Sequence, residues 1–209
     1  MARLPEGRPL LCYITDRRGV SGGNLLPVIE QAIAAGVDLI QIREKDMPTR
    51  PLLALVEAAV ARARGTATRI LVNDRLDLAL AAEAEGVHLP AKGLPVAEVR
   101  RRCPELLIGV SCHNLDELRA AEEGGADFAL FGPVFQPLSK ESAATPLGLE
   151  KLAEAAGAAG IPVLALGGVA LENAADCLRA GAAGLAAISL FQKSADLKET
   201  VEQLRRLNR

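Results

Sequence analysis

The chain has 209 residues, a length that suits one large core and leaves no room for a second domain beside it. Half of the residues are hydrophobic but only 2% are aromatic, so the core must be built from Ala, Val, Leu and Ile. The formal net charge of -2 and the lack of an uninterrupted apolar stretch of membrane-spanning length argue against partners such as nucleic acid or a membrane.

Two further features bear on the cellular compartment. Residues 1–5 lack the apolar core of a signal peptide, so we expect a cytoplasmic protein. The four cysteines are far apart and form no CxxC pair, which predicts free thiols and neither a disulfide framework nor a cysteine metal site. They are Cys12, Cys103, Cys112 and Cys177.

A short apolar run followed by a helix-like stretch repeats about eight times. The expected strands cover residues 10–14, 37–42, 70–72, 86–89, 106–110, 128–131, 163–166 and 185–188. The expected helices cover residues 25–33, 48–63, 76–82, 96–102, a segment capped by Asn114, 149–158, 171–180 and 197–207. Strands that alternate with helices predict a parallel sheet. Eight such units predict an α/β fold, a single (β/α)8 TIM barrel that spans residues 1–209.

A barrel of this kind carries its chemistry at the C-terminal ends of its strands. Gln41, Arg43 and Lys45 follow the second strand, and strand alternation would point them the same way. Two cations and an amide that project together suit a polyanion such as pyrophosphate. The alternative is a solvated charge cluster in which the cations pair with Glu44 and Asp46.

The third and fifth strands end in residues suited to metal binding and proton transfer. Asn73 and Asp74 follow the third strand and could hold Mg²⁺ with substrate phosphates; the alternative is a cap on the next helix. Ser111 and His113 follow the fifth strand, where a histidine could act as general acid or base. His88 lies inside a short strand, and we interpret it as a packing or backbone-bonding residue.

The segments after the sixth, seventh and eighth strands predict a lid and a phosphate site. The long loop 132–146 after the sixth strand contains Ser139 and Lys140, a lysine that could close over a phosphate or simply lie exposed. Two strand ends, the seventh and eighth, form the usual phosphate site of a barrel. Its candidate residues here are Gly167, Gly168, Ile188 and Ser189. The sequence therefore predicts an enzyme that joins or rearranges small phosphorylated molecules.

Motifs at the strand ends resemble the thiamine phosphate synthase and thiazole tautomerase family over nearly the whole chain. They are Tyr13-Ile14-Thr15-Asp16, Gln41-Ile42-Arg43-Glu44-Lys45, Asn73-Asp74-Arg75, Gly86-Val87-His88-Leu89, Gly109-Val110-Ser111, Phe131-Gly132-Pro133-Val134-Phe135 and Leu166-Gly167-Gly168. The resemblance implies a (β/α)8 barrel that joins hydroxymethylpyrimidine pyrophosphate to thiazole phosphate and releases pyrophosphate with Mg²⁺.

The same resemblance implies a role for each matching residue. The pyrimidine pyrophosphate would be held by Gln41, Arg43, Lys45 and Asn73, and Mg²⁺ by Asp74. Pyrophosphate would contact Ser111 and Lys140, with Ser139 supplying a hydroxyl, and thiazole phosphate would lie on Gly168, Ile188 and Ser189. We therefore expect catalytic roles for Arg43, Ser111, His113 and Lys140.

Two positions depart from the synthase pattern. After the fourth strand Pro90-Ala91-Lys92-Gly93 replaces a segment that ends in a second Mg²⁺-binding Asp, so that carboxylate is absent at Gly93. Pro137 stands where a synthase-like threonine is expected, whereas Pro133 matches the synthase and not the tautomerase. Besides a synthase, the sequence leaves open a metal-independent tautomerase with His113 as base, and a thiamine phosphate binder without turnover. A homodimer also stays open.

Overall fold

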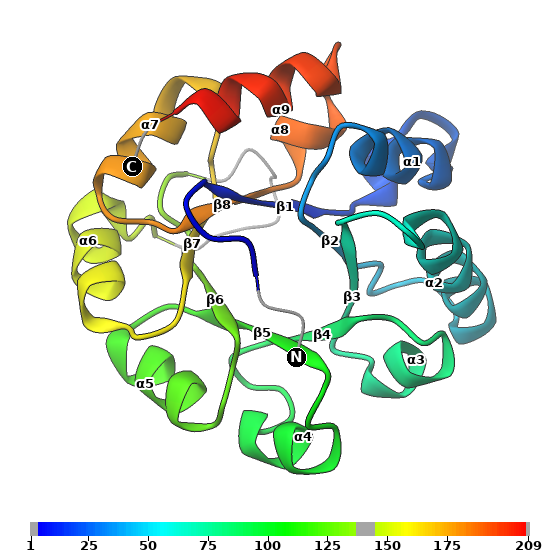
Figure 1. Ribbon diagram of the computed structural model, residues 1–209, viewed down its shortest axis with the longest axis horizontal. Coiled ribbons are helices and arrows are strands. Elements are labelled where there is room, and N and C mark those ends of the chain that lie inside the picture. Colours follow the sequence, from blue (N-terminus) through cyan, green and yellow to red (C-terminus); the bar gives the residue numbers. More distant parts are fainter. Residues whose placement is uncertain (1–3, 137–144, 208–209) are drawn as a thin grey trace.

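Eight parallel strands close into a barrel in the order β1 to β8 in the computed structural model, which describes residues 4–136 and 145–207 (Figure 1). Closure comes from β1 pairing with β8, for example Leu10 beside Gly184. The predicted parallel barrel is confirmed. The strands are β1 (Leu10–Ile14), β2 (Leu39–Ile42), β3 (Arg69–Asn73), β4 (Gly86–Leu89), β5 (Leu107–Cys112), β6 (Phe128–Phe131), β7 (Val163–Leu166) and β8 (Gly184–Ala187).

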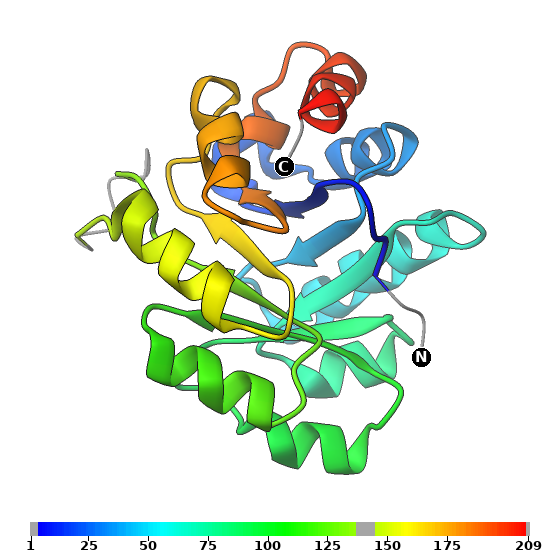
Figure 2. The same ribbon diagram turned by 60° about the vertical axis from the view of Figure 1, so that its left-hand side comes forward.

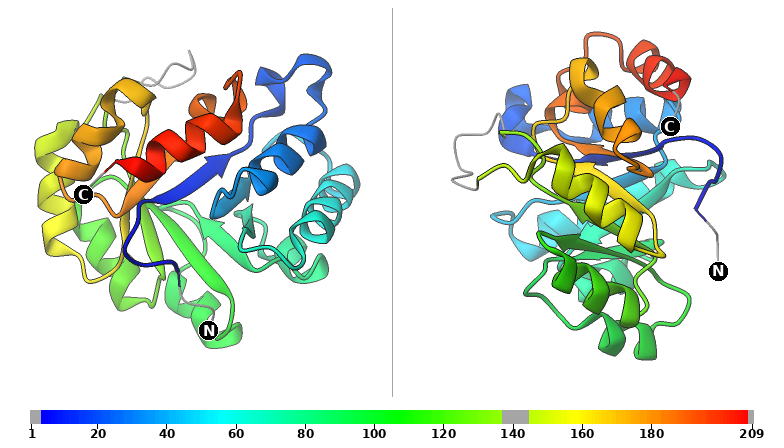
Figure 3. Two further views of the ribbon diagram at one scale, coloured as in Figure 1. Left: turned by 45° about the horizontal axis from the view of Figure 1, so that its top comes forward. Right: turned by 90° about the vertical axis from the view of Figure 1, so that its left-hand side faces the viewer.

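The helices form a ring outside the strands, and the N-terminal segment lies at one end of the barrel (Figures 2 and 3). They are α1 (Leu26–Ala34), α2 (Thr49–Ala63), α3 (Leu76–Ala81), α4 (Val96–Arg102), α5 (Leu115–Glu123), α6 (Gly148–Ala158), α7 (Leu171–Arg179), α8 (Ser189–Gln192) and α9 (Leu197–Arg206). Two short 3-10 turns, η1 (Arg17–Gly19) and η2 (Ser21–Gly23), follow β1. In the described ranges no helix has both the length and the apolar run that a membrane span requires.

Several element boundaries differ from the prediction by one or two residues, and one short helix was not predicted. Val37 belongs to the turn after α1, because its N–H donates to the Ala32 carbonyl at 3.1 Å, so β2 begins at Leu39. β5 continues to Cys112, two residues past its predicted end. The four-residue helix α8 was not predicted, since so short a segment shows no helical periodicity.

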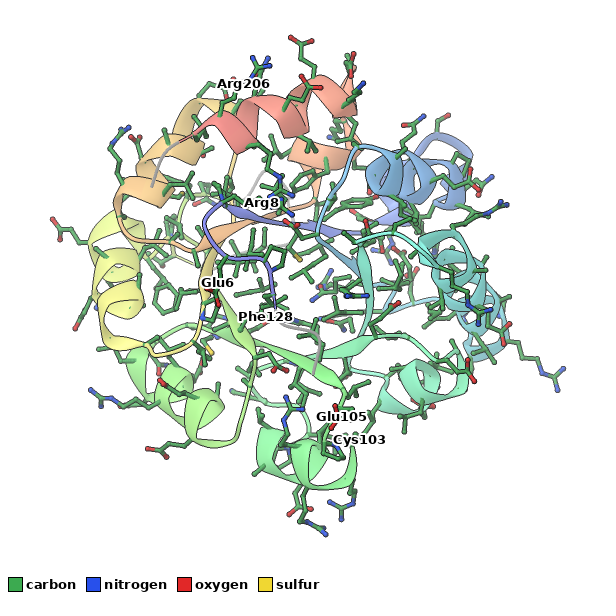
Figure 4. All side chains as sticks on the ribbon, viewed as in Figure 1. Glu6, Arg8, Cys103, Glu105, Phe128 and Arg206 are labelled. Carbon is green, nitrogen blue, oxygen red and sulfur yellow. The ribbon has the colours of Figure 1, made fainter. Side chains whose placement is uncertain are left out.

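Alternate residues along each strand serve two separate cores. Side chains on the inner face fill the barrel and make it a packed core, with Phe128 inside the ring of strands (Figure 4). This inner cluster is Leu10, Cys12, Ile14, Leu39, Leu71, Phe128, Leu130, Leu164 and Ala186. Outward-facing residues such as Leu11, Tyr13 and Ile40 pack in the larger cluster beneath the helices. All four cysteines are free thiols.

Three acidic side chains tie the bottom of the barrel together. Each stands before an even-numbered strand and accepts the N–H of a residue near the start of the previous strand. The pairs are Asp38 with Leu11 at 2.8 Å, Glu85 with Ile70 at 2.9 Å and Asp127 with Ile108 at 2.7 Å. Asp38, only 3% exposed, also binds Arg8 at 2.7 Å and Arg205 of α9 at 2.8 Å. Asp38 therefore joins the N-terminal segment, the barrel and the last helix.

Replacing Asp38 with Ala should lower the free energy of unfolding by about 3–5 kcal/mol, because the buried Leu11 N–H loses its acceptor and two arginines lose the carboxylate that they share. Urea denaturation would measure the change. Asp116→Ala is the matched control, since that side chain is 94% exposed and should change stability by less than about 1 kcal/mol. Equal effects of the two substitutions would contradict the structural role of Asp38.

Candidate active site

The acid within the β2 motif belongs to the scaffold. Glu44 is 5% exposed, and its carboxylate accepts the Thr15 hydroxyl at 2.7 Å and the Arg17 N–H at 3.1 and 3.2 Å. Burial is the main influence on this carboxyl and raises its pKa above the ordinary value. Glu44 thus binds Thr15 and Arg17, which follow β1, and does not pair with Arg43 or Lys45.

The cations of the same motif have no acidic partner in the described part of the chain. Asp46 pairs with Arg17 and with Arg18, the latter at 3.1 Å. No hydrogen bond or ion pair among the described residues engages the side chains of Arg43 or Lys45. The alternative prediction of a self-neutralised charge cluster is therefore wrong for these residues, and both cations are available to an anion.

Below these cations, polar side chains line the upper interior of the barrel. Gln41 alternates with Leu39 of the inner cluster, and the His88 ring lies 6.1 Å from that of Phe128. His88 Nε2 and the Ser111 hydroxyl lie 2.8 Å apart. Gln41 Nε2 and His88 Nδ1 are buried and have no hydrogen-bond partner among the described residues. Such orphaned atoms call for a bound ligand or water.

The electrostatics of this interior keep His88 neutral. Its side chain is 1% exposed, and burial followed by the charge of Arg43 lowers its pKa from 6.5 to about 3. Because the ring carries no charge near neutral pH, it can orient the Ser111 hydroxyl without adding a cation to the site. Sequence reasoning missed this contact; the inward alternation of β4 was the available signal.

The Asp74 carboxylate, directly after β3, makes no hydrogen bond or ion pair within residues 4–136 and 145–207. Its φ of +62° lies in the left-handed region, and the N-cap of α3 is Arg75, with no side-chain cap. The predicted capping role is therefore wrong. Arg75 instead binds Asp77 at 2.8 and 2.7 Å. A Cβ built at Gly93 would lie 3.3 Å from Asp74 Oδ1, so the turn after β4 closes on this carboxylate.

This arrangement fits a magnesium ion that shares its coordination with a substrate. The described residues contain no group of three or more His, Cys, Asp or Glu side chains able to hold a metal. Mg²⁺ is commonly bound through one or two protein carboxylates plus phosphates and water. The carboxylate of Asp74, which has no ion-pair partner in the part of the chain that the structure describes, can supply that one ligand.

The predicted phosphate residues line one cavity between the ends of β7 and β8. Its volume is about 220 Å³, and Gly167, Gly168, Ile188 and Ser189 all lie on its wall, with Lys193 beside them. Gly167 and Gly168 have φ values of +93° and +64°, which other residues rarely adopt. Lys193 and the two glycines on its wall, with Asp16 nearby, make this cavity a candidate site for an anion.

Other predicted residues lie apart from these clusters or outside the described ranges. The His113 side chain is 53% exposed, and its Nδ1 lies 2.9 Å from Glu117 of α5. Ser139, Lys140 and Pro137 lie outside the described residues. Asn73 is the last residue of β3.

Sequence analysis also missed Gln192, the last residue of α8. Its Oε1 accepts the Tyr13 hydroxyl at 2.8 Å and the Asp16 N–H at 3.2 Å, and its Nε2 donates to the Asp16 carbonyl at 2.8 Å. No pattern in the sequence marks this residue, because α8 itself is too short to be predicted.

A larger cavity, about 370 Å³, opens at the opposite end of the barrel around Asp38, Glu85 and Asp127. Those carboxylates already accept strand N–H groups. In TIM barrels, residues at the N-terminal ends of the strands usually stabilise the fold and do not take part in catalysis. The smaller cavity at the strand ends is therefore the better candidate for the active site.

Comparison with known proteins identifies the family of the chain. The family described as thiamine monophosphate synthase matches residues 11–191. A Geobacter sulfurreducens relative is 45% identical over 93% of this chain and 92% of its own. The thiamine-phosphate synthase of Roseiflexus castenholzii is 40% identical over 88% of this chain and 82% of its own. The structure of thiamine phosphate pyrophosphorylase from Pyrococcus furiosus is 33% identical with a TM-score of 0.83, covering 95% of both chains.

Acid should destabilise the protein through His88. At a pH between about 3, the pKa of His88 in the folded protein, and 6.5, its ordinary value, this imidazole is protonated in the unfolded chain but not in the folded one. The contribution of neutral His88 to the free energy of unfolding is complete above pH 6.5. It falls by about 1.4 kcal/mol for each pH unit as the pH drops from about 6 to 4. Urea denaturation across this range should show that His88→Gln removes this part of the slope. His113→Gln, a change at an exposed histidine, should keep it; equal slopes in wild type and His88→Gln would contradict the assignment.

Proposed function

The chain belongs to the thiamine monophosphate synthase family, and from this premise we propose how its barrel mouth performs the synthase reaction. The protein is a thiamine-phosphate synthase, a transferase of thiamine biosynthesis. The relatives named above favour this activity over the tautomerase. In the reaction, the bond between the pyrimidine methylene and pyrophosphate breaks, a bond from that methylene to the thiazole nitrogen forms, and pyrophosphate leaves.

The observation that carries the proposal is the pair of unneutralised cations at the end of β2. Arg43 and Lys45 have no acidic partner in the described ranges, while Glu44 and Asp46 are occupied by the β1 tip. Negative charge accumulates on the pyrophosphate as it leaves, so fixed cations stabilise the transition state more than the bound substrate. Arg43 is therefore assigned a catalytic role as well as a binding one.

The polar interior beneath Arg43 suits the pyrimidine ring. The amide nitrogen of Gln41 and Nδ1 of His88 are buried and have no hydrogen-bond partner in the described ranges. A ring with nitrogen atoms and an amino group offers hydrogen bonds to both. The neutral state of His88 matters here, because a second positive charge would oppose the cationic methylene that forms. Ser111, held by His88, can then donate its hydroxyl to the leaving pyrophosphate.

Asp74 and Asn73 would hold Mg²⁺ against the pyrophosphate. When bound, Mg²⁺ neutralises charge on the leaving phosphate oxygens. The described residues offer the ion the carboxylate of Asp74, and substrate oxygens and water would supply its other ligands. Asn73, at the end of β3, can supply an amide to the same group.

The cavity at β7 and β8 is the proposed site for thiazole phosphate. Gly167 and Gly168 would present backbone N–H groups to the phosphate, and Ile188 and Ser189 close the opposite wall. The resemblance assigns Ser139 and Lys140 to the leaving pyrophosphate and leaves His113 as a candidate for proton transfer. Because both substrates are phosphorylated and cannot diffuse across a membrane, we also propose that the enzyme acts in the cytoplasm.

Asp74→Asn should lower the rate of pyrophosphate release by about 100-fold or more with both substrates and Mg²⁺ present, because the amide cannot neutralise the ion. A coupled pyrophosphate assay measures the rate. Asp77→Asn is the matched control, since that carboxylate is engaged by Arg75 and should leave the rate within about threefold. Full activity of wild type in excess chelator, or of Asp74→Asn, would contradict the metal assignment.

Arg43→Met should raise the KM for the pyrimidine pyrophosphate by about 10-fold and also reduce kcat, because a charged hydrogen bond to the leaving group is lost. The KM for thiazole phosphate should stay within about threefold. Arg50→Met changes an exposed arginine of α2 and serves as the control. An equal rise of both KM values would show that Arg43 supports the fold of the site instead of binding pyrophosphate.

A further inference from the structure

A hydrogen-bond chain leads away from the proposed phosphate cavity. Gln192 and Asp16 both lie on the wall of that cavity. The Gln192 side chain makes two hydrogen bonds to the backbone of the β1 tip (residues 15 and 16, which follow β1): it accepts the Asp16 N–H and donates to the Asp16 carbonyl. The Tyr13 hydroxyl donates to the same side-chain oxygen at 2.8 Å and fixes the orientation of the amide.

The chain continues from the β1 tip to the β2 tip. Thr15 is fully buried, its hydroxyl donates to Glu44 at 2.7 Å and accepts the Arg43 N–H at 3.0 Å. The Thr15 N–H donates to the Gln41 carbonyl at 3.0 Å. The backbone of Gln41, proposed to bind the pyrimidine ring, and that of Arg43, proposed to bind pyrophosphate, are therefore both tied to Thr15. Thr15 is the residue before the Asp16 that Gln192 holds.

These contacts connect the walls of two different subsites. The end at Gln192 borders the cavity for thiazole phosphate, and the end at Arg43 carries a cation for pyrophosphate. Hydroxyl and amide contacts of this kind are directional, and Thr15 and Glu44 are shielded from water. A displacement of α8 relative to β1 would therefore be passed to the backbone of Arg43.

We propose that Gln192 is a positioning residue that sets the separation of the two substrates. The inference rests on the proposed synthase function, in which the thiazole nitrogen must meet the pyrimidine methylene. Bond formation between two bound molecules depends steeply on their alignment, and a shift of about 1 Å can cost a factor of about 100 in rate. Gln192 acts through the β1 and β2 tips and not by touching the reacting atoms.

Gln192→Met keeps the length of the side chain and removes its three hydrogen bonds. We expect kcat to fall about 10- to 100-fold while the KM values of both substrates stay within about threefold. Thr15→Val breaks the same chain at a second place and should act in the same direction. The kcat of the double variant should be only slightly lower than that of the more impaired single variant, because substitutions within one hydrogen-bond network have non-additive effects. Gln31→Met, on the exposed face of α1, is the control.

Amide hydrogen exchange gives a readout that does not depend on turnover. In Gln192→Met, exchange should quicken in peptides that cover residues 15–20 and also in those that cover residues 41–47. A rise in the KM for thiazole phosphate alone would make Gln192 a direct phosphate contact and overturn the proposal. So would unchanged kinetics with a lowered melting temperature, or faster exchange confined to residues 15–20. Wild-type turnover in the same assay tests the synthase function separately.

Discussion

The strict alternation of side chains in a closed parallel barrel is the constraint on which the rest of this structure depends. Leu39 and Gln41 differ by two positions on β2, so both face the interior, one in the apolar core and the other among the polar groups above it. The core therefore supports the site directly, since the same strands carry both. A residue at the mouth cannot turn away without moving the core residue next to it on the strand.

A second theme is the use of carboxylates to hold backbone. Asp38, Glu85 and Asp127 accept strand N–H groups at the bottom of the barrel, and Glu44 accepts the Arg17 N–H at the mouth. Although the net charge is -2, acids committed to the scaffold leave Arg43 unpaired in the described ranges. The net charge of the chain therefore does not predict the electrostatic potential at the barrel mouth. That potential depends on which charged side chains are paired locally.

The fold could be predicted because it depends on local patterns. Strand-like runs of three to six residues alternated with helical periodicity, and the predicted bounds of β1, β4, β6 and β7 match the observed ones. The strand ends that form the candidate site could be predicted, but the contacts between their side chains could not. The burial of Glu44 depends on Thr15 from another strand, and the His88–Ser111 bond spans 23 residues. Neither is written in a local pattern, and the same holds for Gln192 on its four-residue helix.

The tight turn after β4 has a consequence for how this family member could change. A Cβ at Gly93 would approach Pro90 Cδ to 2.9 Å and the Pro90 carbonyl to 3.1 Å, besides facing Asp74 at 3.3 Å. Any side chain at position 93 would therefore require Pro90 to shift. A second carboxylate beside Asp74 thus needs a rearranged turn as well as a new residue at Gly93, so the backbone here limits which single substitutions this site can accept.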